Sequence, residues 1–311
     1  MRPSFLQSSP PGPPCFSPGF APGTFLGSSR YLFQYLPPAG RRALRCMVCL
    51  LLAGLLAGCA GNTRLREVRA FAAEAPRLDG YLELSQRYRD TYQRERPYLP
   101  PAAEQREAAI DAQRRAAYPD LVAIHDAVGA YLRTLGKLAG GDRFDPGDQI
   151  KEVAKGIKAW PDTGLTDRHV NAVSGLARLL ARTATGPAQD EAVQDMLRDG
   201  YQPLRDALDA MSTVLRYYDK NHDNEQAIVI GMLDTEIPFA GQPEARLLAA
   251  LAKVHRQERL DEYRLLGRRH TLARQHVEAL RARHEALYRG LAPAGPPPAA
   301  RVAANPRGAQ P

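Results

Sequence analysis

Histidines are the residues of this chain that most readily suggest metal or acid–base chemistry. The seven are His125, His169, His222, His255, His270, His276 and His284. Two metal-binding histidines on one helix must be three or four residues apart, so that both rings project from the same face. The nearest pair on one expected helix, His270 and His276, is six residues apart, and no H-E-x-x-H motif occurs. The sequence therefore predicts no metal centre and no other cofactor.

The polar run from Asp219 to Glu225 is a second place where chemistry is conceivable. Oxygen-bearing side chains alternate at Asp219, Asn221 and Asp223, and this spacing resembles the first half of an EF-hand calcium loop. The resemblance fails at Asn224, where the loop needs glycine, and at Ile230, where it needs a bidentate glutamate. We expect a polar turn between two helices, in which Asp219, Asn221 and Asp223 form a weak candidate site for a cation.

The cysteines lie in the first fifth of the chain, at positions 15, 46, 49 and 59. Cys46 and Cys49 form a C-x-x-C motif, which is typical of redox pairs and of half zinc sites. Here the motif runs directly into the apolar residues 50–56, and no second ligand pair follows. We expect neither use.

Residues 41–58 have the order of a secretory signal. Arg41, Arg42 and Arg45 precede an apolar run from Met47 to Leu56, which is too short to span a bilayer as a helix. The run ends in Leu56-Ala57-Gly58-Cys59, and these four residues resemble the lipobox of bacterial lipoproteins.

The lipobox resemblance implies cleavage between Gly58 and Cys59 and acylation of Cys59 with fatty acids such as palmitate. Two or three acyl chains anchor a protein firmly to a membrane. Ala60 and Gly61 follow the cysteine, so the Asp of the inner-membrane retention signal is missing, and the expected place is the outer membrane, facing the periplasm. The alternative is an uncleaved anchor, or an apolar stretch that merely precedes a cysteine.

Residues 1–40 fit a signal peptide poorly, because they are rich in Pro, Gly and Ser and have no apolar period. We expect a disordered leader, consistent with translation that starts further downstream, near Leu44 or Met47. A genuine long leader is the alternative.

The net charge argues against a nucleic-acid partner. The chain carries +8, but residues 1–58 contain five Arg and no acidic residue. The remainder has 37 basic and 34 acidic residues, which is ordinary for a globular domain.

Apolar residues at alternating spacings of three and four dominate the rest of the chain, and such spacing is typical of helices that pack nearly parallel. One series runs from Leu121 to Leu138 and stops at Gly140-Gly141, and a shorter one covers 150–160. Further series cover 170–180 and 197–218, and we expect the second of these to kink or break near Gly200 because of Pro203. Residues 227–237 suit a short buried helix, although 228–230 alone would suit a strand.

The last series belongs to one long helix from about Pro243 to Leu291. Its seam is Leu266, His270, Ala273, Val277, Leu280, His284, Leu287 and Leu291. His270 and His284 therefore occupy seam positions, where a polar residue can fix helix register; a pH-sensitive switch is the alternative.

These patterns predict an all-α, elongated bundle of six to eight helices with heptad-like seams over residues 59–292. The Pro- and Ala-rich tail, residues 293–311, is expected to be disordered. Tyr81, Tyr88, Tyr92 and Tyr98 alternate with arginines; they suit either the bundle core, with hydroxyls at the surface, or stacking on sugars or bases.

The functional hypothesis follows from the anchor and the seams together. Phosphate-binding glycine loops, nucleophile elbows and convincing paired-carboxylate motifs do not occur in the sequence. We expect a lipid-anchored envelope protein that contacts the membrane through acylated Cys59 and binds or scaffolds an envelope protein through helix surfaces. The alternative is a hydrolase or small-ligand carrier with a pocket between helices.

Overall fold

Helices account for nearly all of the structure. The computed structural model describes Met47 and residues 63–141, 156–183, 189–240 and 242–291. Among these residues the only β-type pairing is one isolated bridge, between Trp160 and Leu165. The predicted all-α bundle with a long C-terminal helix is confirmed.

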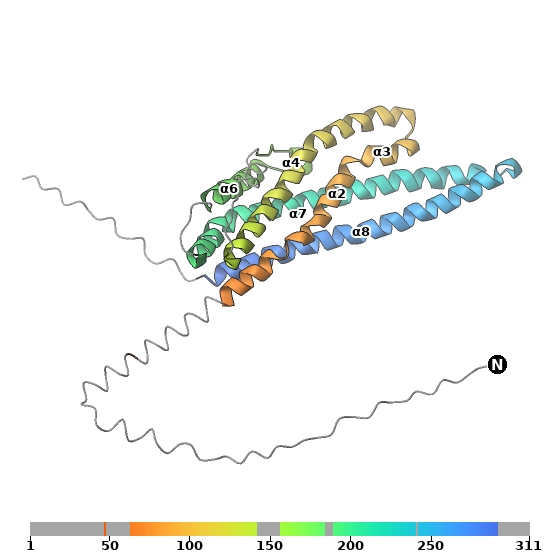
Figure 1. Ribbon diagram of the computed structural model, residues 1–311. Helices are drawn as coiled ribbons and strands as arrows, with labels where there is room; N and C mark the ends of the chain where they lie inside the picture. The colour runs from red at the N-terminus through yellow and green to blue at the C-terminus, as the bar shows by residue number, and fades with distance from the viewer. Residues whose placement is uncertain (1–46, 48–62, 142–155, 184–188, 241, 292–311) are drawn as a thin grey trace, which may run out of the picture. The chain divides into compact units, whose positions relative to one another are not determined.

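Six α-helices pack against each other, and short 3-10 turns precede or separate several of them (Figure 1). After a helical segment at 63–72, the α-helices are α2 (Asp79–Arg89), α3 (Thr91–Glu95), α4 (Pro101–Gly140), α6 (Asp167–Thr183), α7 (Gln189–Glu236) and α8 (Arg246–Arg289). The 3-10 turns are η1 (Ala75–Leu78), η2 (Arg96–Tyr98), η3 (Pro161–Thr163), η4 (Ile237–Ala240) and η5 (Pro243–Ala245). None of the helices in the described part of the chain has the length and apolar character needed to cross a bilayer.

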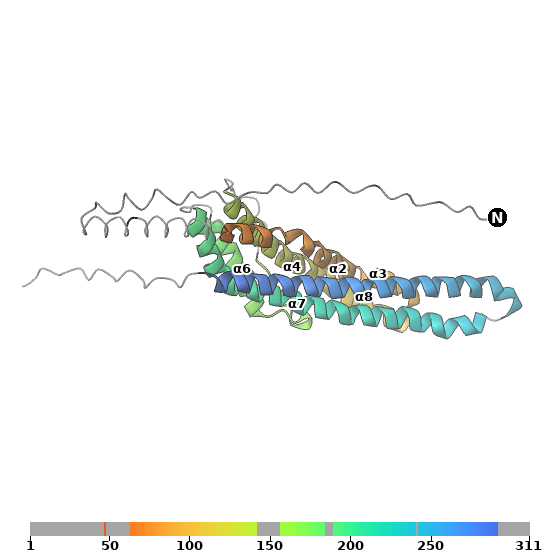
Figure 2. The same ribbon diagram turned by 90° about the horizontal axis from the view of Figure 1, so that it is seen from below.

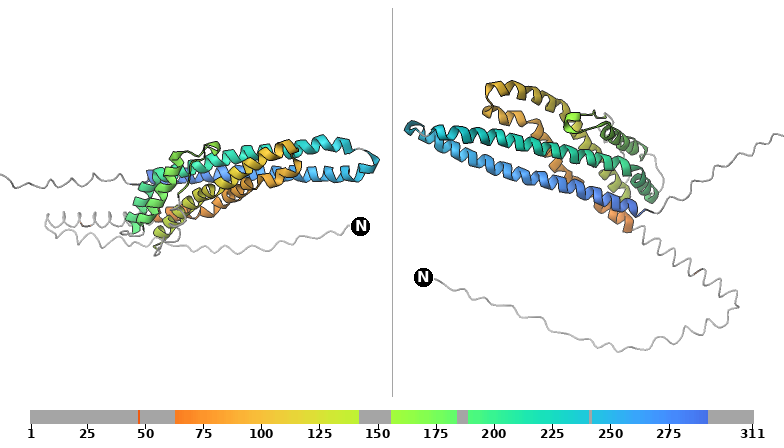
Figure 3. Two further views of the ribbon diagram at one scale, coloured as in Figure 1. Left: turned by 90° about the horizontal axis from the view of Figure 1, so that it is seen from above. Right: turned by 180° about the vertical axis from the view of Figure 1, so that it is seen from behind.

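The antiparallel pair α7–α8 forms the long axis of the bundle, and its turn extends beyond α2, α3 and α4 (Figures 2 and 3). At the opposite end, residues 63–72 lie beside the last turns of α8. There Arg283 Nη1 is 2.6 Å from Glu74 Oε1, and the rings of Phe71 and His284 stack at 5.7 Å. We call this the proximal end, and the end formed by η4 and η5 the distal end.

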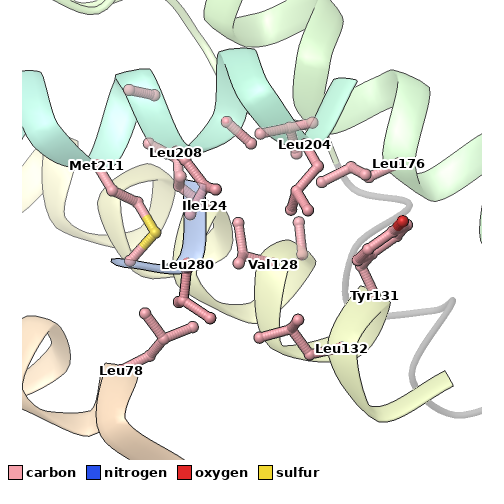
Figure 4. Close-up of a cluster of buried hydrophobic side chains, with 14 of the residues drawn as sticks. Leu78, Ile124, Val128, Tyr131, Leu132, Leu176, Leu204, Leu208, Met211 and Leu280 are labelled. Atoms are coloured by element: carbon pink, nitrogen blue, oxygen red, sulfur yellow. The ribbon is translucent and has the colours of Figure 1, made fainter. Parts of the chain in front are cut away.

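The main apolar core fills the proximal half, where α4 packs against α2, α6 and α7. Figure 4 shows side chains from several helices meeting there, among them Ile124, Val128 and Leu280. Most of the series predicted on α4 is buried, and only Leu138 is partly exposed. The helix ends where predicted, because Gly141 adopts a left-handed conformation with φ 81°, which glycine tolerates without a Cβ clash.

A smaller apolar cluster lies toward the distal end. It consists of Val229 and Leu233 on α7 with Tyr263 and Leu266 on α8. Each of the two clusters holds α7 against α8, and polar residues separate them.

Two of the expected helix boundaries are wrong. Residues 156–159 are not helical, and Gly156 has a φ of 68°; the predicted helix therefore does not reach Ile157 and Trp160, and its earlier part lies outside the described residues. Of the kink or break expected near Gly200, the break is absent, because α7 continues through Pro203 from Gln189 to Glu236. A Cβ at Gly175 on α6 would lie 3.2 Å from Pro203 Cγ, so the proline ring packs closely against a neighbouring helix.

The expected turn at 219–225 and the separate short helix or strand at 227–237 are also wrong. Residues 219–236 belong to α7 without interruption, and Ile237 begins η4. The predicted long C-terminal helix is present as α8. The leader, Gly58, Cys59 and residues 293–311 lie outside the described residues, as does the rest of the signal segment except Met47.

Candidate functional site

A buried polar layer separates the two apolar clusters. Beyond Tyr218, the seam of α7 continues through His222 and Glu225 to Val229, again at spacings of four, three and four. On α8 the corresponding position is His270, between Leu266 and Ala273. We call His222, Glu225 and His270, together with Arg87 and Arg94, the polar layer.

Glu225 is the centre of this layer and is only 1% exposed. Its carboxylate accepts hydrogen bonds from Arg94 Nε and Nη2 at 2.9 and 2.7 Å, and from Arg87 Nη2 at 2.9 Å. The Tyr263 hydroxyl, at 3.4 Å, also donates to it. Arg87 pairs in addition with Glu262 at 3.0 Å. A buried carboxylate needs such partners, and here they come from α2, α3 and α8, so that one group ties four helices together.

Asn221 extends the hydrogen bonding from α7 to α3 and α4. Its Nδ2 donates to Thr91 Oγ1 at 2.9 Å, and its Oδ1 accepts a hydrogen bond from Arg114 Nη2 at 3.1 Å. Arg114 also lies 2.7 Å from Glu107 Oε1. The side chain of Asn221 therefore holds helices together and does not belong to an ion-binding loop.

The other two residues of the weak candidate cation site, Asp219 and Asp223, do not join Asn221 in one site. Asp219 pairs with Arg274 on α8 at 3.1 Å, and Asp223 is exposed. Because the segment is helical, Asp219, Asn221 and Asp223 do not converge on one point. Within the described ranges, no group of three His, Cys, Asp or Glu side chains is placed to hold a metal ion.

His270 and His284 lie on the buried face of α8, 3% and 2% exposed. His284 Nε2 is 2.9 Å from the Tyr131 hydroxyl, which also donates to the carbonyl of Met196 at 3.3 Å. Burial lowers the pKa of His284 to about 4. It also lowers the pKa of His270 to about 4, although Asp219 opposes that shift. Burial therefore favours the neutral form of both rings at neutral pH.

Glu95, at the end of α3, is the most unusual acidic group. It is fully buried, and neither of its carboxyl oxygens accepts a hydrogen bond from the described residues. Burial first, and then the charge of Glu107, raise the pKa of Glu95 to about 7, while Arg114 acts in the opposite direction. Glu95 therefore keeps a proton over part of the neutral range. We call Glu95 and its neighbour Glu107 the carboxyl pair.

A cleft of about 730 Å³ opens near the distal end, beside this carboxyl pair. Its walls come from residues 97–110 on one side and from α7 on the other. The apolar lining includes Tyr98, Leu99, Ile110, Ile228 and Met232, and the charged lining residues are Arg106, Glu107 and Glu236. The volume falls within the range typical of small-molecule sites.

The outer face of α8 carries an exposed apolar stripe. We call Leu247, Leu251, Val254, Leu265 and Leu272 the α8 stripe; each is more than half exposed. Their spacings fit a second 3.5-residue seam beside the buried one, with Glu258, Asp261 and Arg268 at the intervening positions. Phe239 and Leu248, also largely exposed, add apolar surface at the distal end.

Comparisons with known proteins give no identification. No model of a protein family, no curated protein and no solved structure matches this chain. The functional argument therefore rests on the residues and their geometry.

Two tyrosines of the tyrosine and arginine series at residues 77–98 belong to the core. Tyr81 and Tyr88 are buried, but the expectation that their hydroxyls reach the surface is wrong for Tyr81, whose hydroxyl is buried and donates to the Leu121 carbonyl at 3.2 Å. Tyr92 is partly buried, and Tyr98 lines the cleft, with its hydroxyl 2.6 Å from His255 Nε2.

Sequence reasoning missed Glu95, Glu225 and the cleft. One signal was present for Glu225, because continuing the seam of α7 by three and four residues beyond Tyr218 reaches His222 and then Glu225. No local pattern marks Glu95, whose neighbours Glu107 and Glu225 come from other helices.

Proposed function

We propose that the protein is a lipid-anchored component of the bacterial cell envelope that binds a partner protein through the α8 stripe and has a scaffolding role. The exposed stripe is the observation that carries this proposal. Exposed apolar side chains that share one face of a helix are typical of interaction sites, and Leu247, Leu251 and Val254 occupy consecutive positions of this seam. Fully burying each Leu or Val would contribute about 1.5–3 kcal/mol, which makes the stripe a substantial docking surface.

The anchor proposal rests on the lipobox-like residues Leu56 to Cys59. Cys59 precedes the described helical segment at 63–72 by only a few residues, and that segment lies at the proximal end. Acylation of Cys59 would therefore hold the proximal end near the outer membrane, with the protein in the periplasm. At a rise of 1.5 Å per residue, the distance along α8 between Leu287 and Leu247 is about 60 Å.

The partner that fits the stripe is a helix with apolar residues at 3.5-residue spacing. Glu258 and Asp261 interrupt the stripe near its middle, so basic residues at that level of the partner would be complementary. The other possibility raised by the sequence, a small-ligand carrier, is favoured by one observation, the distal cleft.

Anchoring is tested by feeding cells an alkyne-tagged palmitate and isolating the full-length protein. We expect label and membrane association in the wild type, and loss of both in Cys59→Ser. A wild-type protein that stays unlabelled and is recovered in the cytosol would refute the anchor.

Docking is tested by placing a photocrosslinking amino acid at Leu251 or Leu265, with Thr271 as the matched control. Thr271 is exposed on the same helix but lies outside the stripe. We expect positions 251 and 265 to yield the same adduct with one envelope protein, and position 271 to yield none. The adduct should disappear in Leu247→Glu, which changes a side chain that is 72% exposed and leaves the fold intact. Equal adducts from all three positions, or adducts only between copies of this chain, would contradict the proposal.

A further inference from the structure

The distal cleft combines an apolar lining with an excess of carboxyl groups. Glu107 and Glu236 line it together with a single basic residue, Arg106. The pattern of apolar walls and a few charged groups is typical of sites that fix the orientation of a small ligand. The excess of negative charge favours a ligand that carries a positively charged group.

Glu95, whose carboxyl interacts with that of Glu107, supplies the second observation. Its carboxyl is completely buried and accepts no hydrogen bond from the part of the chain that the structure describes. An isolated buried carboxyl is costly unless it is neutralised or paired. A cation bound at Glu107 would give the carboxyl pair the positive partner that Arg114 alone provides at present.

We propose that the distal cleft is a binding site for an amphiphilic amine, a small molecule in which an apolar chain carries one ammonium group. The chain lies along Leu99, Ile110 and Met232, and the ammonium group donates hydrogen bonds to Glu107. This site is independent of the lipid anchor and of the α8 stripe.

Binding should release a proton from the carboxyl pair. At neutral pH Glu95 carries a proton for part of the time, because burial and Glu107 raise its pKa to about 7. An ammonium group beside Glu107 favours the ionised form of Glu95, so that proton leaves to solvent when the amine binds.

Other charged groups surround the pair from each packed helix. On α4 this group is Arg114, and on α7 it is Glu225, whose partners Arg94 and Arg87 lie on α3 and α2. His255 on α8 reaches the cleft region through its contact with Tyr98. The variant Glu95→Gln separates the contribution of Glu95 from that of His255.

Three ligands with the same chain and different head groups test the site: octylamine, octan-1-ol and octanoate. Titrations of the full chain are followed by calorimetry and by the NMR signal of the Met232 methyl group, which lines the cleft. We expect octylamine to bind about tenfold more tightly than octanol, the ratio that corresponds to one charge-assisted hydrogen bond. Octanoate should bind most weakly, and Glu107→Gln should abolish the preference for the amine.

Gly231 and Gly267 provide a matched pair of variants. Gly231 lines the cleft, and at both glycines an added Cβ would meet no atom within 4 Å. Gly231→Leu should fill the cleft and remove binding of all three ligands, whereas Gly267→Leu, on α8, should leave it unchanged. Calorimetry in two buffers of different ionisation enthalpy should detect proton release on octylamine binding, and Glu95→Gln should suppress it.

Several results would overturn the proposal. They are absence of binding by octylamine, equal binding of the amine and the alcohol, and undiminished binding in Gly231→Leu. A wild-type protein that binds octylamine without releasing a proton would refute the role assigned to Glu95.

Discussion

Replacing the buried carboxyl of Glu95 should change how the stability of the fold depends on pH. Between about pH 4.5 and pH 7, the folded protein keeps a proton on Glu95 that the unfolded chain has lost. Rising pH therefore favours unfolding across this interval. The contribution of Glu95 to stability is complete below pH 4.5 and is lost by about pH 7, because the pKa in the folded state is raised.

The size of the effect follows from the shift. A pKa that rises from 4.5 to about 7 corresponds to about 3 kcal/mol between the two ends of the interval. Glu95→Gln keeps the shape of the protonated side chain and cannot ionise. We expect this variant to match the wild type near pH 4.5 and to exceed its free energy of unfolding by up to about 3 kcal/mol near pH 8.

Urea denaturation followed by far-UV circular dichroism, repeated at several pH values, measures this difference. Glu83→Gln is the control, because Glu83 is 64% exposed and pairs only loosely with Arg269, at 3.6 Å. A difference in the free energy of unfolding between Glu95→Gln and the wild type that is the same at every pH would refute the reasoning. A variant that becomes less stable relative to the wild type as pH rises would also refute it.

Three further predictions concern the helix contacts. Glu225→Gln removes the carboxylate that Arg94 and Arg87 share, leaves Arg87 only its pair with Glu262, and should cost about 3–5 kcal/mol. Glu262→Gln, at a partly exposed ion pair, should cost at most about 1 kcal/mol in the same denaturation assay. Gly200→Ala should cost about 1–3 kcal/mol by overpacking, since its Cβ would lie 2.6 Å from the Tyr131 ring; Gly267→Ala, with open space around it, should be neutral or stabilising. The pKa of His284 is lowered to about 4, so this histidine adds stability above about pH 6.5 that is lost toward pH 4. His284→Phe should reduce that loss, which acid titration of the circular dichroism signal would show.

The periodic apolar series predicted the proximal half of the bundle well. The apolar series from Leu121 to Leu135 is buried as its spacing indicates, because burying a single apolar face of a helix against other helices is favourable. The end of α4 was predictable too, since Gly141 can adopt a positive φ. Local signals of this kind require no knowledge of the partner helix.

The polar part of α7 was misread for a physical reason. Residues 219–225 look like a turn because isolated polar side chains favour solvent. In the bundle, however, Glu225 meets Arg94, which lies 131 residues earlier in the chain, and Asn221 meets Arg114. Pairings over such separations leave no local pattern. The cleft is likewise unpredictable from spacing, because it depends on how residues 97–110 diverge from α7.

The polar layer also explains why the bundle needs one register. Apolar seams alone allow α8 to slide past α7 by a heptad with modest loss, because leucine contacts are similar from turn to turn. A slide would separate Glu225 from Tyr263 and move His270 away from His222, whose ring lies 5.3 Å away. The buried Tyr263 hydroxyl would then lose its carboxylate partner, at a cost of about 1–3 kcal/mol. We infer that the layer gives specificity to the α7–α8 pairing, and that pairing sets the positions of both the α8 stripe and the α7 wall of the cleft.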